Sequence, residues 1–491
     1  MSSTPNIYQF LGNFSVSYVN TNLYNSTYIR LVRRYFPLAE FQKFRYKSLA
    51  ELQADIERLG LNIPTTENLS PLGQAVKVGK HTAQNAFAVL PMEGFDCKPN
   101  GAPSDLTHRR YMRYAEGGAG LVWFEACAVL HEGKSNPCQM GISEDSFAEI
   151  KSLVRDFNQT AQDTCGYKPL SILQLTHSGR YSRPDSFSVR KPIIVKHDPE
   201  FDLRVGIDET YPMATDEQLE ALVPIYAKAA ALAKDAGFDG VDIKTCHRYL
   251  LSELLSCYTR PGKFGGSLEN RASLLLRIIS EVRAAVGDDF IIASRFSVFD
   301  DHPYPVGFGA CPERGYPCLD EPLRLTQMMV KAGIDLLSAS GGDVFKGPHI
   351  TRPFNQNVVG GSDPPEHPLE GVVRQMEFSR AVKKVCGNVP LIGTAYTWLR
   401  EYLPNIGAAE IAAGNISMIG FGRGAFAYPD MPKDVLAGRA NPKKYCIACT
   451  KCTQIMRDCG QIGCPVRDAE IYLPIYRKYR AEMEAKLALK K

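Results

Sequence analysis

Short apolar runs alternate with amphipathic segments along most of the chain, from about residue 84 onward. The runs are almost continuously apolar, which is typical of strands buried on both faces, and the segments between them have apolar positions at helical spacing. Eight runs are expected to be strands: NAFAVLP from Asn85, GLVWFEA from Gly120, LSILQL from Leu170, GVDI from Gly240, FIIAS from Phe290, IDLLSAS from Ile334, VPLIG from Val389 and ISMIG from Ile416. Eight strands alternating with helices predict an α/β fold, either a parallel barrel or a doubly wound sheet.

The long irregular segments distinguish between these two folds. Segments of about 181–214, 299–318 and 341–368 all follow strands, whereas the returns from helix to strand are short, such as AGFDG and GNV. Insertions confined to the carboxyl ends of the strands are typical of a barrel with its active site on that face. We therefore expect a (β/α)8 TIM barrel.

Three parts are expected along the chain. Residues 1–83 form an N-terminal extension with one helix over SLAELQADIERLG, which begins after Ser48 and ends at Gly60. Residues 84–440 form the barrel. Residues 441–491 form a small cysteine-rich segment followed by a charged helical tail.

Composition excludes several classes of protein. The chain has 491 residues, of which 44% are hydrophobic and 22% charged, as in an ordinary globular enzyme. The net charge of +4 predicts neither nucleic-acid binding nor a basic membrane patch. There is no apolar run long enough to span a membrane and no signal-peptide pattern at the start. A cytoplasmic enzyme without a membrane or nucleic-acid partner is expected.

Cysteine is the unusual residue, with 14 copies, five of them between Cys446 and Cys464. The spacing is Cys446-x2-Cys449-x2-Cys452-x11-Cys464. Three thiolates at this spacing let one loop wrap a compact iron–sulfur cubane that a distant cysteine completes, so we expect a [4Fe–4S] cluster. Structural zinc is the alternative, but zinc sites more often use two separated C-x2-C pairs. Cys459 is the alternative to Cys464 as fourth ligand.

Distinctive motifs stand at the ends of the predicted strands. They are PMEG (91–94), EAC (125–127), QLTHSGR (174–180), KTCHRYL (244–250), SRFS (294–297), SGG (340–342) and GFGRG (420–424). With FGGSLENR (264–271), GFGRGAFAYPD and the cysteine spacing, the chain resembles the old yellow enzyme family of FMN-dependent oxidoreductases over about residues 84–470. It is most similar to the iron–sulfur branch that contains 2,4-dienoyl-CoA reductase and trimethylamine dehydrogenase.

The resemblance implies an FMN site at the mouth of the barrel. Pro91 and Met92 would lie along the flavin, and Gln174 would bind its pyrimidine edge beside Ala126. Arg295 would face the N1/O2 region, where a fixed cation stabilises the anionic reduced flavin. The loops after strands seven and eight would hold the phosphate through Gly393, Gly422 and Arg423.

The resemblance also places the catalytic groups after the fourth strand. Lys244 and His247 would hold the carbonyl oxygen of the substrate, and Tyr249 would donate a proton to its α-carbon. Lys244 departs from the usual histidine or tyrosine. Glu93 departs from the small residue expected beside the flavin and could pair with Lys244. His349 is a weaker candidate for a second acid.

His177 and Arg180 are interpreted as structural, although the family motif includes both.

The function expected is the reduction of an activated C=C bond in an enoate, enone or enoyl thioester. One alternative is an amine demethylase or dehydrogenase like trimethylamine dehydrogenase, whose aromatic bowl would depend on tyrosines because the chain has only Trp123 and Trp398. Another is a flavin electron carrier. The sequence has no strand–GxGxxG–helix unit of the kind expected for the FAD and NADH domains of larger relatives. Electrons are therefore expected from NAD(P)H directly or from a protein that docks near the cluster, and a homo-oligomer is expected.

Overall fold

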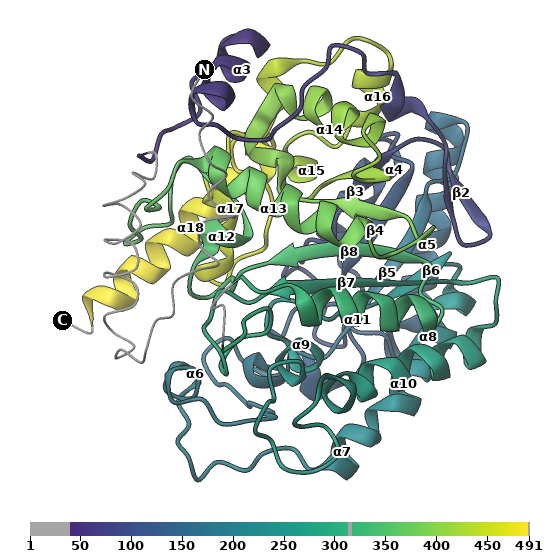
Figure 1. Cartoon of the computed structure of the whole chain (residues 1–491), viewed down its shortest axis with the longest axis vertical. Helices are drawn as coiled ribbons and strands as arrows, with labels where there is room; N and C mark the ends of the chain where they lie inside the picture. Colours follow the sequence, from purple (N-terminus) through teal and green to yellow (C-terminus); the bar gives the residue numbers. More distant parts are fainter. Residues whose placement is uncertain (1–39, 313–316, 490–491) are drawn as a thin grey trace.

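Eight parallel strands close into a barrel with helices around it (Figure 1). The structure is a computed structural model, and it describes residues 40–312 and 317–489. The strands are β3 (Phe87–Val89), β4 (Leu121–Ala128), β5 (Leu170–Thr176), β6 (Gly240–Ile243), β7 (Ile291–Phe299), β8 (Leu336–Gly341), β9 (Leu391–Gly393) and β10 (Met418–Phe421). The first and last strands pair in parallel, with Ile419 opposite Phe87, so the sheet has no edge. The predicted (β/α)8 barrel is confirmed, and every strand falls on one of the eight predicted runs.

The sequence also predicts helices that begin after Ser104, Thr215 and Ser267, and the helices between the strands begin at these capping residues. Ser104 and Ser267 cap α4 and α10 with their side chains. The main helices are α4 (Asp105–Ala115), α5 (Glu144–Cys165), α8 (Leu222–Ala236), α10 (Leu268–Val286), α11 (Asp320–Lys331), α13 (Pro368–Lys383) and α14 (Leu403–Ala412). Shorter helices are α6 (Pro199–Val205), α7 (Asp216–Glu220), α9 (Leu250–Leu254), α12 (Pro348–Thr351), α15 (Arg423–Ala427) and α16 (Met431–Leu436).

One helix expected from the sequence is divided in two. The segment after Thr215 forms α7 and α8, with a break at Ala221. Pro224 has no backbone N–H to donate to the carbonyl of Glu220, which weakens the helix at this point.

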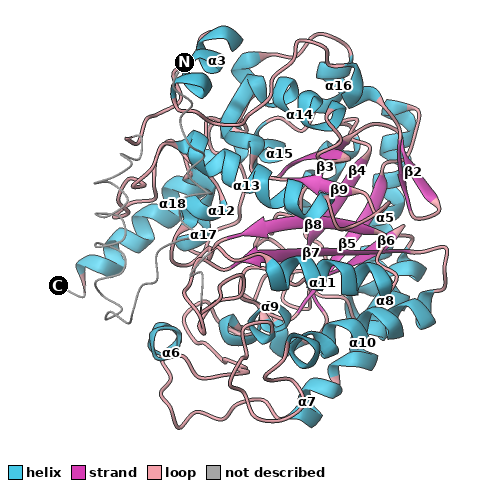
Figure 2. Ribbon diagram, in the orientation of Figure 1, coloured by secondary structure: helices cyan, strands magenta, loops and turns pink. Residues whose placement is uncertain are grey.

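A β-hairpin closes the amino-terminal end of the barrel. It consists of β1 (Val76–Val78) and β2 (His81–Ala83), which precede the barrel strands (Figure 2). Val78 and Ala83 belong to one apolar cluster with residues of the barrel strands, including Trp123. Because this end is filled by side chains, only the carboxyl ends of the strands are available for a site.

The segments outside the barrel pack against its flank. Helix α3 (Leu49–Arg58) is capped by Ser48, as predicted. The cysteine-rich segment contains α17 (Lys451–Arg457) and continues into α18 (Ala469–Ala488), both coloured yellow in Figure 1. It is anchored to the loop after β3, because the Ile462 N–H donates to the Gly94 carbonyl at 2.7 Å. No helix in the described part of the chain is long and apolar enough to cross a membrane.

Candidate active site and cysteine centre

Lys244 follows β6 and places a buried ammonium group between Glu93 and Tyr249. Its Nζ lies 3.9 Å from Glu93 Oε1 and 4.0 Å from the centre of the Tyr249 ring. The Glu93 carboxylate also accepts a 2.9 Å hydrogen bond from Ser135 Oγ. Burial raises the pKa of Glu93, against the opposing charge of Lys244. The contact between Glu93 and Lys244 that the sequence suggested is therefore present.

Tyr249 precedes α9 and is 9% exposed. Burial, and next the negative charge of Glu93, raise the pKa of its phenol well above the ordinary value. The phenol is consequently protonated across the physiological range of pH. It can donate a proton or a hydrogen bond at the mouth of the barrel.

His247 lies on the turn between β6 and α9 in a left-handed conformation, with φ of 64°. Such a conformation costs a non-glycine residue about 1–3 kcal/mol and persists only where the surroundings hold it. Here the backbone N–H donates to Ser297 Oγ at 3.2 Å, and Nε2 lies 3.4 Å from Ser340 Oγ. Burial, followed by the charges of Arg295 and Lys244, lowers the pKa of His247 well below its usual value. The imidazole is therefore neutral.

A carboxylate that the sequence analysis did not single out connects two predicted flavin contacts. Asp242, in the middle of β6, accepts hydrogen bonds from Gln174 Nε2 at 2.5 Å and from the backbone N–H of Arg295 at 2.8 Å. Burial raises its pKa to about 7, although both hydrogen bonds oppose the shift. Asp242 fixes the orientation of the Gln174 amide. Its signal in the sequence is a charged residue inside the otherwise apolar run GVDI.

The guanidinium group of Arg295 has an unused hydrogen-bonding capacity. Its Nε is buried without a hydrogen-bond partner. Among the residues the structure describes, no carboxylate forms an ion pair with this group. A buried donor of this kind is costly unless a ligand completes it. An oxygen-bearing or anionic ring at the mouth of the barrel would supply that partner.

Two glycines at the strand ends around this mouth lie too close to neighbouring side chains to carry a Cβ. A Cβ on Gly422 would lie 2.9 Å from Met92 Sδ, and a Cβ on Gly393 would lie 2.8 Å from the Tyr396 hydroxyl. Pro91 and Met92 follow β3 directly, and Ala126 is buried at an irregularity of β4. Together with the free donor of Arg295, these features fit a planar ring carrying oxygen atoms and a phosphate, as FMN does.

Four of the clustered cysteines line one hollow beside the barrel. Cys446, Cys449, Cys452 and Cys464 all face it, whereas Cys459 is not among its lining residues. The empty space of the hollow is about 370 Å³, including space open to solvent. In the described chain, the one group of three or more ligand atoms within 4.8 Å of one another lies elsewhere, at Asp96, Cys97 and Glu125. No three of the four cysteine sulfurs therefore lie within 4.8 Å of one another.

Arg423 reaches the same hollow. It is the first residue of α15, and it lines the hollow together with the four cysteines. Burial raises the pKa of Cys446 to about 12, and the charge of Arg423 opposes this shift. The residue that the sequence assigned to a phosphate therefore contacts the cysteine centre. The phosphate assignment itself stays a prediction.

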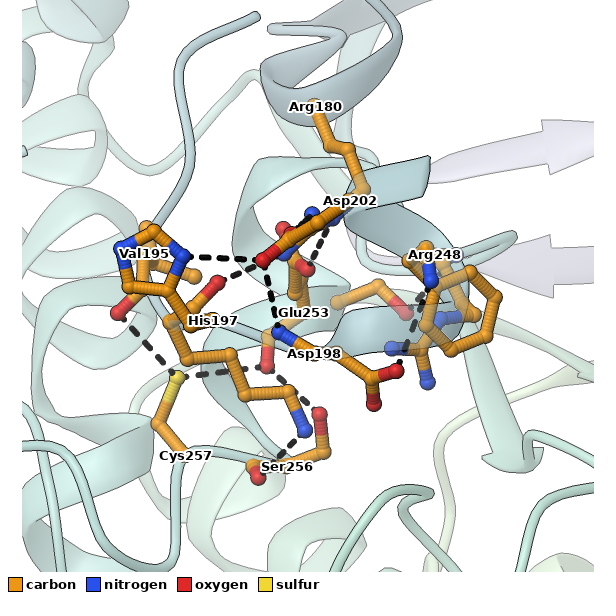
Figure 3. A network of polar contacts seen from close by, with 12 residues as sticks. Arg180, Val195, His197, Asp198, Asp202, Arg248, Glu253, Ser256 and Cys257 are labelled. Atoms are coloured by element: carbon orange, nitrogen blue, oxygen red, sulfur yellow. Dashed lines mark hydrogen bonds and ion pairs between the residues drawn. The ribbon is translucent and has the colours of Figure 1, made fainter. Parts of the chain in front are cut away.

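Arg180 belongs to a buried ionic network beside the site (Figure 3). It is fully buried, and its Nε lies 2.6 Å from Glu253 Oε1 while Nη1 pairs with Asp202. His197 Nδ1 lies 2.8 Å from the second oxygen of Asp202. The network connects the loop after β5 to α6 and α9. This arrangement agrees with the structural role expected of Arg180.

Two histidines of the sequence analysis lie outside the group formed by Lys244, His247 and Tyr249. The ring of His177 accepts a hydrogen bond from the backbone N–H of Gly179 at 3.1 Å, and burial lowers its pKa to about 4. His349 lies in α12, where the charges of Glu366 and Arg374 act on it. In the described part of the chain His349 forms no hydrogen bond or ion pair with Tyr249, and its role as a second acid stays a prediction.

The closed parallel barrel carries its polar groups at the carboxyl ends of the strands, where TIM-barrel enzymes have their active sites. Residues 71–307 match the model of the NADH:flavin oxidoreductase / NADH oxidase family. NADPH dehydrogenase of Halalkalibacterium halodurans is 31% identical over 281 residues, which cover 56% of this chain and 74% of that protein. The chain belongs to this family of flavin oxidoreductases, as the resemblance to the old yellow enzymes implied.

Further relatives extend the match beyond the barrel strands. Cinnamate reductase of Clostridium sporogenes is 25% identical over 404 residues, covering 80% of this chain and 57% of that protein. The structure of an old yellow enzyme homologue from Zymomonas mobilis has a TM-score of 0.54 at 22% identity, covering 76% of this chain and 98% of that one. At this identity the structural likeness shows the fold alone. The chain spans about half the length of several curated relatives that it matches, between 52% and 57% of each.

Proposed function

We propose that the protein is an FMN- and [4Fe–4S]-dependent reductase of activated C=C bonds. The observation that carries this proposal is the grouping of Lys244, His247 and Tyr249 at one end of the barrel. It combines a cation, a neutral imidazole and a buried, protonated phenol. The similarity to a protein named cinnamate reductase also supports it. The substrate is an enoate, enone or enoyl thioester.

Lys244 and His247 bind the carbonyl oxygen of the substrate. Because His247 is neutral, its imidazole donates a hydrogen bond without adding a second full charge. Lys244 supplies the positive charge that draws electron density toward the oxygen and makes the β-carbon electrophilic. Tyr249 then donates the phenolic proton to the α-carbon. When bound, FMN supplies the hydride that reduces the β-carbon.

Pro91, Met92, Glu93, Ala126, Gln174 and Arg295 would hold the flavin ring, and Gly393, Gly422 and Arg423 would hold its phosphate. The free donor of Arg295 supports this assignment. The position of Glu93 close to Lys244 also supports a second role for Glu93. Its carboxylate keeps the ammonium group charged and directed at the mouth until a substrate binds.

Cys446, Cys449, Cys452 and Cys464 would hold the cluster. A zinc ion with Zn–S bonds of about 2.3 Å brings its four sulfurs to roughly 3.8 Å from one another. The wider spacing of these sulfurs favours a larger metal centre such as a cubane, and the lining of the hollow favours Cys464 over Cys459. Electrons come from NAD(P)H at the flavin or from a protein that docks near the cluster. A cytoplasmic location and a homo-oligomer stay predictions.

An amine dehydrogenase is the second candidate, since dimethylamine dehydrogenase of Hyphomicrobium is also similar to this chain. That reaction needs aromatic faces open to a substrate cation. In this site the ammonium group of Lys244 already covers one face of the Tyr249 ring. Arg295 adds a second positive charge without a carboxylate partner. These charges repel a methylammonium substrate and favour an oxygen-bearing one, and the flavin electron carrier has no specific observation in its favour.

The test compares Tyr249→Phe with Tyr181→Phe, whose ring centre lies 6.3 Å away. Loss of a general acid typically costs about 10²–10⁴ in rate. We expect Tyr249→Phe to slow oxidation of the reduced enzyme by enoates by this factor, with flavin reduction unchanged, and Tyr181→Phe to stay near wild type. Equal loss in both half-reactions would contradict the role of Tyr249.

Two further measurements complete the test. Anaerobic purification should yield about four iron and four sulfide per chain, in keeping with a cubane. Cys464→Ser should lose them while Cys459→Ser keeps them. Zinc in place of iron would refute the cluster. Rapid bleaching of the oxidised flavin by methylamines would favour the amine dehydrogenase instead.

A further inference from the structure

The hollow of the four cysteines has a positively charged lining. Arg423 and Arg467 both line it, and no aspartate or glutamate among the described residues does. Arg467 also donates its backbone N–H to Cys464 Sγ at 3.3 Å, and its Nε donates to the Tyr445 carbonyl at 3.2 Å. Arg423, in contrast, has neither an ion pair nor a side-chain hydrogen bond to any described residue. No described carboxylate therefore neutralises its charge next to the cysteines.

A third arginine stands just outside this lining. Arg400 has a left-handed backbone, with φ of 50°, and its guanidinium stacks over the ring of Phe44 at 4.4 Å. Its Nε is buried without a partner. Burial lowers its pKa, whereas Glu401 and the thiols of Cys446 and Cys449 raise it. The cysteine centre therefore lies in the field of at least three arginines.

Arg423 also stands next to the predicted flavin site. The preceding residue, Gly422, comes so close to Met92 that a Cβ on it would lie 2.9 Å from the sulfur. Met92 is one of the residues expected along the flavin. The backbone of this turn thus faces the barrel mouth, whereas the Arg423 side chain lines the cysteine hollow.

We infer that Arg423 is a positioning residue for the cluster, where it stabilises the reduced state and raises the reduction potential. This inference rests on the proposed function, because it requires a cluster on the four cysteines. Reduction adds one negative charge to a centre that four thiolates already make negative. The positive charge of a guanidinium at its edge favours the more negative state, also when the same group holds the flavin phosphate, and net charge with hydrogen bonding to sulfur sets cluster potentials. A role confined to the flavin phosphate would leave the cluster potential unchanged.

The experiment is an anaerobic redox titration of the full chain, followed by the electron paramagnetic resonance signal of the reduced cluster. We expect Arg423→Gln to lower the equilibrium constant for cluster reduction about tenfold, which is about 59 mV for a one-electron couple. Arg423→Lys keeps the charge and should restore most of the potential. The matched control is Arg439→Gln, since Arg439 is exposed and pairs with Asp434.

Flavin content is measured on the same samples. The inference is overturned if Arg423→Gln loses flavin but keeps the wild-type cluster potential. It is also overturned if Arg423→Lys shifts the cluster potential as much as Arg423→Gln does. If Arg423→Gln does not retain the cluster, Arg423→His replaces it. The potential of that variant must then fall more between pH 6 and pH 8 than that of the wild type, and an equal fall overturns the inference. Wild-type protein without iron would instead refute the proposed function.

Discussion

Two neighbouring regions at the carboxyl ends of the strands contain the same kinds of charged residue but differ in how fully the positive side chains are paired. In the network around Arg180, the guanidinium is bound on three sides by Glu253, Asp202 and the Lys196 carbonyl. At the barrel mouth, Arg295 has a buried Nε without a partner, and Lys244 reaches its one carboxylate at 3.9 Å.

This difference distinguishes charged side chains that stabilise the fold from charged side chains that bind a ligand. A buried arginine with all its donors satisfied stabilises the loops that it connects, and removing it leaves uncompensated carboxylates. A guanidinium whose Nε is buried without a protein partner has a desolvation cost that folding does not offset, so we expect a ligand to complete it. Three substitutions test this distinction.

The largest effect is expected in the paired region. Arg180→Met removes the cation and leaves Glu253 and Asp202 buried without it, which should lower the free energy of unfolding by about 3–5 kcal/mol. The measurement is denaturant unfolding of the purified protein. The control is Arg155→Met, whose exposed pair with Asp156 should contribute less than about 1 kcal/mol. Equal effects of the two substitutions would show that burial of the network does not matter.

A smaller effect is expected at the barrel mouth, and it concerns flavin affinity rather than stability. Arg295→Met removes a hydrogen bond from a charged donor to the flavin, typically about 1.5–3 kcal/mol, so flavin affinity should fall roughly 10- to 100-fold. The stability of the flavin-free protein should change little, because no protein partner is lost. Flavin titration and unfolding of the same sample provide both values. A large loss of stability with unchanged flavin affinity would place Arg295 with the structural arginines.

The third effect, which is small within any one pH unit, concerns the pH dependence of stability and rests on Asp242. Because burial raises its pKa to about 7, the folded state holds a proton that the unfolded state has already lost. Its contribution to stability is therefore complete below about pH 4 and is lost as the pH rises through 7. Asp242→Asn should remove a slope of up to about 1.4 kcal/mol per pH unit in this range. Identical slopes in wild type and variant would contradict the raised pKa.

The sequence was most informative where the environment of a residue depends only on its own segment. Runs apolar on both faces predicted all eight strands, and Ser48, Ser104 and Ser267 marked helix starts correctly. It was less informative for β1 and β2, because strands of three residues have too little pattern to be recognised. Asp242 was missed because the significance of a charge inside a buried strand depends on Gln174 and Arg295, which lie on the two neighbouring strands.

By itself, the sequence determined the parallel barrel, the order of its strands and the set of polar residues at their carboxyl ends, since backbone pairing and apolar burial follow from local pattern. Only the tertiary structure decided which of those residues meet. It brings Cys464 rather than Cys459 to the cysteine hollow, and it directs Arg423 there as well. It also leaves Arg295 unpaired while Arg180 is satisfied. Pairing depends on distances of a few ångströms between segments far apart in the chain, and no local pattern encodes those distances.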